Sequence, residues 1–203
     1  VKENKIPIVF CTSYYTGFKK DCVLTDYAEG SYQLTRYLLE NGHRELWYFV
    51  TSDKKLPVAQ ERISGYRRAF AEMGLDVEQD WIVGCDDISV EYGYAKTKQL
   101  LQSGRTPDGI LALNDYMAYG IKKAIQECGY RIPEDISLAG YDDVFYHLIA
   151  DKPLTTVHQD LDSMAANTVN LLMQKMNKDF QPKQPVQHLI RPSLVVRKTT
   201  KGD

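Results

Sequence analysis

The sequence predicts an α/β fold in which most strands run parallel. Short apolar runs alternate along the chain with longer segments in which apolar residues recur at i, i+3 and i+4. Each strand–helix unit spans roughly 30–40 residues, the length of a right-handed crossover between parallel strands. With 203 residues, the chain is long enough for one large domain or two small lobes.

The first half of the chain shows strand runs separated by helices with clear start and stop signals. Asp26 and Ser89 can each accept a backbone hydrogen bond at the start of a helix, and Gly42 and Gly74 are typical stop residues. We therefore expect strands at 6–10, 23–25, 46–50 and 81–83, and helices from Asp26 to Gly42, over 58–74 and from Ser89 to about Gln102.

The second half continues the same alternation. Asn114 or Asp115 can cap a helix that ends at Gly129, and Asp160 can cap the last helix. Strands are expected at 109–113, 136–140, 155–157, 186–190 and 194–197.

Composition excludes several functional classes for this segment. The net charge is −2, and basic residues occur in pairs rather than in long runs, so strong nucleic-acid binding by this segment alone is not expected. No apolar stretch reaches membrane-spanning length, and no signal peptide precedes the first strand. The chain starts with Val1 rather than Met, so we expect an upstream portion to have been left out.

Cofactor and metal signatures are also absent from the sequence. The glycine patterns of dinucleotide-binding and phosphate-binding loops do not occur, and the four histidines lack zinc-ligand spacing. We expect no cofactor and no metal, and we interpret the four cysteines as free thiols in a reducing compartment.

Polar residues follow several of the predicted strands. Ligands of open parallel sheets bind beyond the carboxyl ends of the strands. Paired hydrogen-bonding groups beside aromatic rings suit a small polyhydroxy ligand. The residues that this rule selects include Ser13, Tyr14, Arg62, Asn114, Asp115, Asp142, Asp143 and Gln159.

Several motifs in order resemble the effector-binding domain of the LacI/GalR family of bacterial transcription regulators. They are "NDYMAYG", "GYRIPEDISLAGYDD" and "PLTTVHQD", preceded by "LTRYLLENGHRELWYF" and "ERISGYRRAF" and followed by "RPSLVVRKTT". The resemblance implies a two-lobed, periplasmic-binding-protein-like fold whose first lobe is truncated at its N-terminus. It places 1–27 and 159–192 in the first lobe and 28–158 and 193–203 in the second. It also implies that the family's DNA-binding helix-turn-helix domain is missing from this chain.

The resemblance also suggests roles for individual residues, each with a plain structural alternative. Arg62 is a ligand-binding arginine or an exposed helix charge, and Asn114 is a ligand contact or a helix cap. Asp142 is expected to bind ligand hydroxyls, and Asp143 to fix the loop. Gln159 is expected either to contact both the ligand and the crossover between the two lobes, or to be a solvated strand end. The remaining candidates are Asp26, favoured as a helix cap, and the weaker Ser13 and Tyr14.

The stretch "VFYHLIA" is too apolar for an ordinary loop. It is either core or a self-complementary dimer surface, and we favour the dimer surface. The residues expected in such an interface are Tyr119, Val144, Phe145, Leu148 and Ile149. Relatives often place an aromatic ring where this chain has Ile88, which leaves the identity of the effector open.

We therefore expect a cytoplasmic, homodimeric ligand-sensing domain that binds a sugar or sugar derivative between its lobes and changes the operator affinity of the attached domain. The alternative is a periplasmic sugar-binding protein of a transport system. We do not expect an enzyme, because carboxyls that flank a glycosidic bond are about 5–10 Å apart on opposite sides, whereas the side chains of neighbours such as Asp142 and Asp143 diverge.

Overall fold

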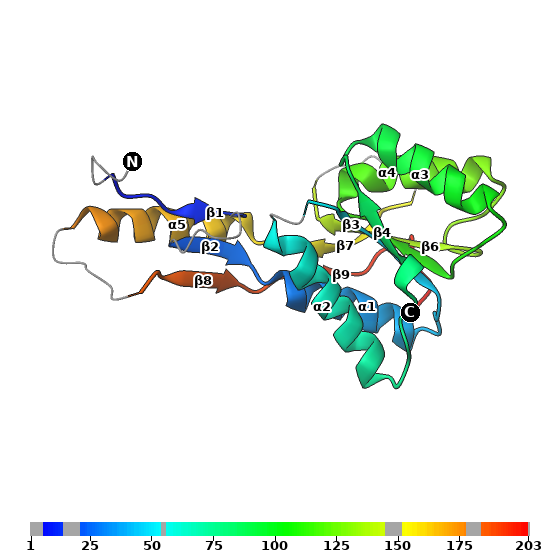
Figure 1. Cartoon of the computed structure of the whole chain (residues 1–203), viewed down its shortest axis with the longest axis horizontal. Coiled ribbons are helices and arrows are strands. Elements are labelled where there is room, and N and C mark those ends of the chain that lie inside the picture. The colour runs from blue at the N-terminus through cyan, green and yellow to red at the C-terminus, as the bar shows by residue number, and fades with distance from the viewer. Residues whose placement is uncertain (1–5, 14–20, 54–55, 145–151, 178–183, 203) are drawn as a thin grey trace.

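The structure is a computed structural model that describes residues 6–13, 21–53, 56–144, 152–177 and 184–202. Figure 1 shows an elongated molecule with a small sheet at one end and a larger sheet at the other. The small sheet has the order β1-β2-β8, and the large one the order β4-β3-β5-β6-β7-β9.

The small sheet is parallel throughout and is covered by one helix. Its core consists of Val23, Met164 and Leu171, with a few partly buried apolar side chains around them. The elements of this part are β1 (Phe10–Cys11), β2 (Cys22–Thr25), β8 (Gln187–Ile190) and α5 (Leu161–Met176).

The large sheet is parallel except for its last pair, β7 with β9, which is antiparallel. Its strands are β3 (Leu46–Thr51), β4 (Ile82–Cys85), β5 (Gly109–Leu111), β6 (Ser137–Asp142), β7 (Thr155–His158) and β9 (Ser193–Val195).

Two pairs of helices cover the faces of the large sheet (Figure 1). Side chains of β3 alternate between two separate cores: Tyr48 belongs to one, and Trp47 and Phe49 belong to the other. A strand buried on both faces explains why "LWYFV" is a continuous apolar run. The helices are α1 (Tyr27–Glu40) and α2 (Pro57–Glu72) on one face, α3 (Val90–Gln102) and α4 (Asp115–Glu127) on the other, and the short η1 (Gln79–Trp81) before β4.

The predicted helix caps are confirmed. Asp26, Ser89, Asn114 and Asp160 each accept a hydrogen bond from a backbone N–H of the first helical turn, at 2.7–3.2 Å. Such caps satisfy amide groups that have no partner inside the helix. No helix in the described ranges is long and apolar enough to cross a membrane.

The predicted fold class is therefore confirmed, with corrections at some strand ends. The first strand covers only Phe10–Cys11 rather than 6–10, because Phe10 pairs with Cys22, the first residue of its neighbour. The strand expected at 109–113 ends at Leu111, and the last strand begins and ends earlier than 194–197.

Candidate functional site

The carboxyl ends of the two sheets meet at one hydrogen-bonded link. Gln159 accepts a hydrogen bond from Thr25 Oγ1 at 2.5 Å and donates one from Nε2 to Asp142 Oδ1 at 2.6 Å. Thr25 is the last residue of β2, and Asp142 is the last residue of β6. Gln159 therefore connects the two parts of the molecule, and it is not a free, solvated strand end.

Arg62 is buried on α2 beside this link, with only 7% of its surface exposed, so the exposed-charge alternative is wrong. Its guanidinium stacks on the ring of Tyr141, with Cζ 3.7 Å from the ring centroid. Nη1 donates to the Leu113 carbonyl at 2.5 Å, whereas the buried Nε has no partner among the described residues. A buried N–H without a partner is costly, so this donor would gain from a hydrogen bond that the described residues do not supply.

Asp142 lies half-buried close to Arg62. Burial raises the pKa of the Asp142 carboxyl, while Arg62 and the hydrogen bond from Gln159 act in the opposite direction. Its φ of 110° is a strained conformation for a residue other than glycine. Such strain is often found at binding sites, where the surrounding structure holds it in place.

Asp143 points to different partners from those of its neighbour. It accepts from Arg197 Nη2 at 2.6 Å and lies 3.0 Å from His158 Nδ1. These contacts join the ends of β6, β7 and β9, as expected for a residue that fixes the loop.

Asp115 is the most buried carboxyl near the site, with 3% of its surface exposed. It accepts hydrogen bonds from Thr156 Oγ1 at 2.6 Å and from the Val144 N–H at 3.0 Å. Burial raises the pKa of Asp115 to about 7, and the nearby Asp142 and Asp143 add to the increase.

A cavity of about 220 Å³ opens beside Arg62. Its lining is mainly apolar and comes from the ends of β3 and β5, the start of α2 and the loop before α3. The side chains that line it are Ser13, Val50, Thr51, Leu56, Val58, Ala59, Arg62, Ile88 and Leu113.

The structure brings together only part of the predicted set. Ser13 and Arg62 line this cavity, whereas Asp142 interacts electrostatically with Arg62 and Gln159 donates to Asp142 without lining the cavity. Asn114 and Asp26 use their side chains as helix caps, and Tyr14 lies outside the described residues.

The expected dimer surface is described only in part. Tyr119 is 36% exposed on α4, and Val144 is half-buried. Phe145, Leu148 and Ile149 lie outside the described residues.

Tyrosines around Arg62 were missed as site residues. Tyr27 and Tyr141 contact the guanidinium, and the buried Tyr48 lies close enough to interact with it electrostatically. Tyr48 lies inside the apolar run of β3, Tyr141 lies near the end of β6, and Tyr27 is the first residue of α1. The one signal that could have selected Tyr141 is its position next to Asp142.

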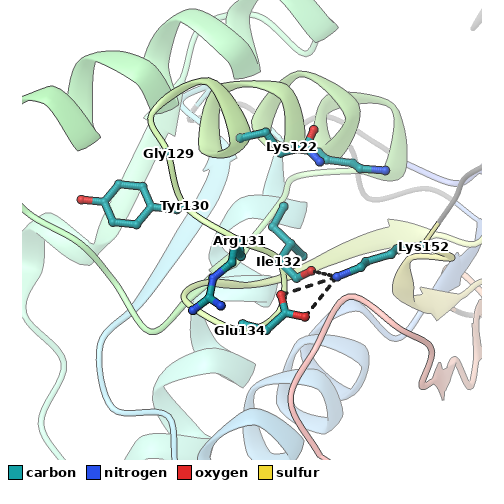
Figure 2. Close-up of a pocket in the computed structure, with 8 residues that line it drawn as sticks. Lys122, Gly129, Tyr130, Arg131, Ile132, Glu134 and Lys152 are labelled. Carbon is teal, nitrogen blue, oxygen red and sulfur yellow. Dashed lines mark hydrogen bonds and ion pairs between the residues drawn. The ribbon is translucent and has the colours of Figure 1, made fainter.

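A second cavity, of about 550 Å³, lies at the C-terminal end of α4, whereas the first cavity lies near the N-terminal end of this helix (Figure 2). Lys152 Nζ donates there to the Ile132 carbonyl and lies 3.2 Å from a carboxylate oxygen of Glu134. Arg131 pairs with Asp135 at 2.8 Å. None of the predicted site residues lines this cavity, and two of its cations are matched by carboxylates. No cluster of metal-binding side chains occurs in the described part of the chain.

Comparison with known proteins identifies one family. Residues 35–200 match the family of periplasmic binding protein-like domains. The HTH-type transcriptional repressor PurR of Pasteurella multocida is 33% identical over 174 residues, which cover 86% of this chain and 51% of the repressor. The chain thus spans about half the length of this curated relative.

Solved structures agree with this match. A putative LacI-family transcriptional regulator from Sanguibacter keddieii superposes with a TM-score of 0.87 at 27% identity, covering 97% of this chain and 72% of the regulator. A LacI-family regulator from Enterococcus faecium with bound ribose gives a TM-score of 0.82 at 26% identity, covering 98% of this chain and 72% of the regulator.

Proposed function

Since this chain belongs to the LacI/GalR family of periplasmic-binding-protein-like effector domains, we propose that it senses a sugar or sugar derivative at the junction of its two sheets. In this proposal the bound molecule favours one arrangement of the two parts over the other. That preference changes the affinity for operator DNA of a helix-turn-helix domain in the longer protein.

The observation that supports this proposal most directly is the state of Arg62. The side chain is buried, lines the cavity, and has an Nε without a partner among the described residues. A guanidinium fork can donate to two adjacent hydroxyls, and the Asp142 carboxylate can accept from others. The cavity also suits a small ligand, and the similar Enterococcus faecium regulator is described with bound ribose.

We propose Arg62, Asp142, Gln159 and Ser13 as the main ligand contacts. The weaker candidates are Asn114 and Asp26, whose side chains already serve as helix caps, and Tyr14, which lies outside the described residues.

The two sheets correspond, in this proposal, to two lobes. The first contains 1–27 and 159–192, and the second contains 28–158 and 193–203. Gln159 lies at their boundary and contacts both Thr25 and Asp142, so a ligand that competes for these hydrogen bonds acts directly on the connection between the lobes.

We further propose that the protein forms a homodimer through a surface around Tyr119 and Val144, together with Phe145, Leu148 and Ile149. We place it in the cytoplasm, where the four free cysteines would stay reduced.

A thermal-shift and calorimetry series tests the ligand site. D-ribose, D-glucose and cellobiose are the sugar probes, and hypoxanthine is the non-sugar probe. We expect a sugar to raise the melting temperature of the wild type by mass action. Asp142→Asn and Arg62→Met should abolish this shift while leaving the far-ultraviolet circular dichroism unchanged.

Arg67→Met is the matched control, since Arg67 is exposed on the same helix. It should respond to the sugar as the wild type does. Unchanged affinity in Asp142→Asn would contradict the site, and a response to hypoxanthine alone would contradict the class of ligand.

A further inference from the structure

Tyr27 connects the small sheet to the surroundings of Arg62. It is the first residue of α1, directly after the crossover from β2, and its side chain is buried. Its ring centroid lies 5.4 Å from Arg62 Cζ and 6.2 Å from the ring of Tyr141. Its hydroxyl donates to the Thr12 carbonyl at 2.6 Å, and Thr12 directly follows β1. A single side chain thus contacts both parts of the molecule.

Thr12 needs such support because its backbone is strained. Its φ is 68°, in the left-handed region that β-branched residues rarely adopt. Conformations of this kind persist where neighbouring contacts determine them. Here the Thr12 N–H donates to the Val23 carbonyl at 3.1 Å, and its own carbonyl accepts from Tyr27.

Ser13 takes its position from this arrangement. Its N–H donates to the Cys11 carbonyl at 2.9 Å, and Ser13 lines the same cavity as Arg62. The direction in which the chain leaves Thr12 therefore decides where Ser13 lies relative to the guanidinium.

The Tyr27 hydroxyl remains a hydrogen-bond donor across the physiological pH range. Burial raises the pKa of Tyr27 to about 12, although Arg62 acts in the opposite direction. The contact with Thr12 therefore does not depend on the ionisation of Tyr27 at ordinary pH.

We propose that Tyr27 is a positioning residue for ligand binding: its hydroxyl holds the left-handed backbone of Thr12 and so fixes Ser13 in the cavity beside Arg62. This inference rests on the proposed function. Tyr27 is not among the residues that were selected because they follow the carboxyl ends of predicted strands. It acts on the ligand site through Thr12 and Ser13.

The test compares two substitutions that each remove one buried hydroxyl. Tyr27→Phe removes the donor to Thr12. Tyr66→Phe is the matched control, because the Tyr66 hydroxyl also donates to a backbone carbonyl at 2.6 Å, that of Leu46, but Tyr66 does not line the cavity. Both rings stay in place, so similar falls in melting temperature are expected.

Amide hydrogen exchange, followed by NMR without any ligand, measures the first claim. Exchange at Thr12 and Ser13 should become about tenfold faster in Tyr27→Phe, since loss of one hydrogen bond lowers the free energy of local opening. It should not change in Tyr66→Phe.

Calorimetry with D-ribose, D-glucose and cellobiose measures the second claim. The affinity for the sugar probes that bind the wild type should fall by roughly three- to tenfold in Tyr27→Phe, and not in Tyr66→Phe.

Each outcome decides one claim. Unchanged exchange at Thr12 and Ser13 in Tyr27→Phe overturns the proposal. Faster exchange with unchanged affinity overturns the role in binding. A wild type that binds none of the three sugars contradicts the proposed function instead, and the exchange comparison still decides whether Tyr27 fixes Ser13.

Discussion

At the scale of single residues, Asp115 is a carboxyl whose charge the fold disfavours. Its surroundings are buried, and two other carboxylates, Asp142 and Asp143, lie close by. Gly140 leaves room for it, because a Cβ at that position would overlap Asp115 Oδ1. Thr156 Oγ1 and the Val144 N–H both donate to the carboxylate and partly offset the effect of burial, whereas the protonated carboxyl can itself donate to the Thr156 hydroxyl and still accept from the Val144 N–H.

Asp115→Asn should therefore stabilise the fold increasingly as pH rises. The pKa of Asp115 is raised from 3.8 to about 7, so its stabilising contribution is complete below the ordinary value and is lost as pH rises through 7. An asparagine side chain is neutral at every pH, and it can donate to the Thr156 hydroxyl and accept from the Val144 N–H. The gain over the wild type should grow by about 2 kcal/mol between about pH 5 and pH 8, measured by urea unfolding.

Asp135→Asn is the control for this pH series. Hydrogen bonds from Arg131 hold the pKa of Asp135 at about 2, so the stability that this carboxylate supplies is lost only in acid. Its effect should be constant between about pH 5 and pH 8. A constant difference for Asp115→Asn as well would show that its carboxyl titrates normally.

The sequence could predict which strand ends supply the candidate site, but not the environment of each side chain. The predicted positions of Arg62, Asp142 and Gln159 lie close together in the structure. The stacking of Arg62 on Tyr141 joins residues far apart along the chain, and so does the bond from Tyr27 to Thr12. Local periodicity contains no information about such contacts, because it depends only on residues that are close together in the sequence.

At the scale of elements, each of the two helix pairs has a close backbone approach at a glycine. A Cβ at Gly65 on α2 would overlap the Ala28 carbonyl oxygen on α1, and a Cβ at Gly120 on α4 would overlap the Val90 carbonyl oxygen on α3. Glycine normally weakens a helix, so its presence here indicates that close packing of the backbones outweighs helix propensity.

Gly65→Ala should thus destabilise the fold, although propensity alone predicts a gain of about 1 kcal/mol. The added methyl group would push α1 and α2 apart, and overpacking of this kind costs about 1–3 kcal/mol. Urea unfolding measures the change. Ser64→Ala, at the exposed neighbouring position, should raise the free energy of unfolding by a few tenths of a kcal/mol. A stabilised Gly65→Ala would mean that the helices are not in contact there.

Helix boundaries were predictable because caps and stops are local. Asp26, Ser89, Asn114 and Asp160 all act as caps. Strand ends depend instead on the partner strand. Residues 6–9 are apolar, so their sequence predicts a strand. The neighbouring strand β2 begins opposite Phe10, however, so residues 6–9 have no pairing with β2. The antiparallel pairing of β9 with β7 likewise has no signal in its own residues.

At the scale of the whole molecule, the two parts differ greatly in the size of their cores. The part built on β1, β2 and β8 buries a small apolar cluster under α5, whereas the large sheet has an extensive core on each face. Stability follows buried apolar area, so we expect the two parts to differ in stability. Gln159 makes hydrogen bonds that would couple them.

Native-state hydrogen exchange should reveal this difference. The amides of Leu171 on α5 and Ile121 on α4 form a matched pair, because both are buried apolar residues inside long helices. We expect Leu171 to exchange at a free energy lower than that of Ile121 by a few kcal/mol, through an opening that leaves the large sheet folded. Gln159→Leu removes both hydrogen bonds of the link, so it should reduce the protection of Leu171 further and leave that of Ile121 unchanged. Equal exchange free energies for the two amides, falling together in Gln159→Leu, would instead mean that the chain unfolds as a single cooperative unit.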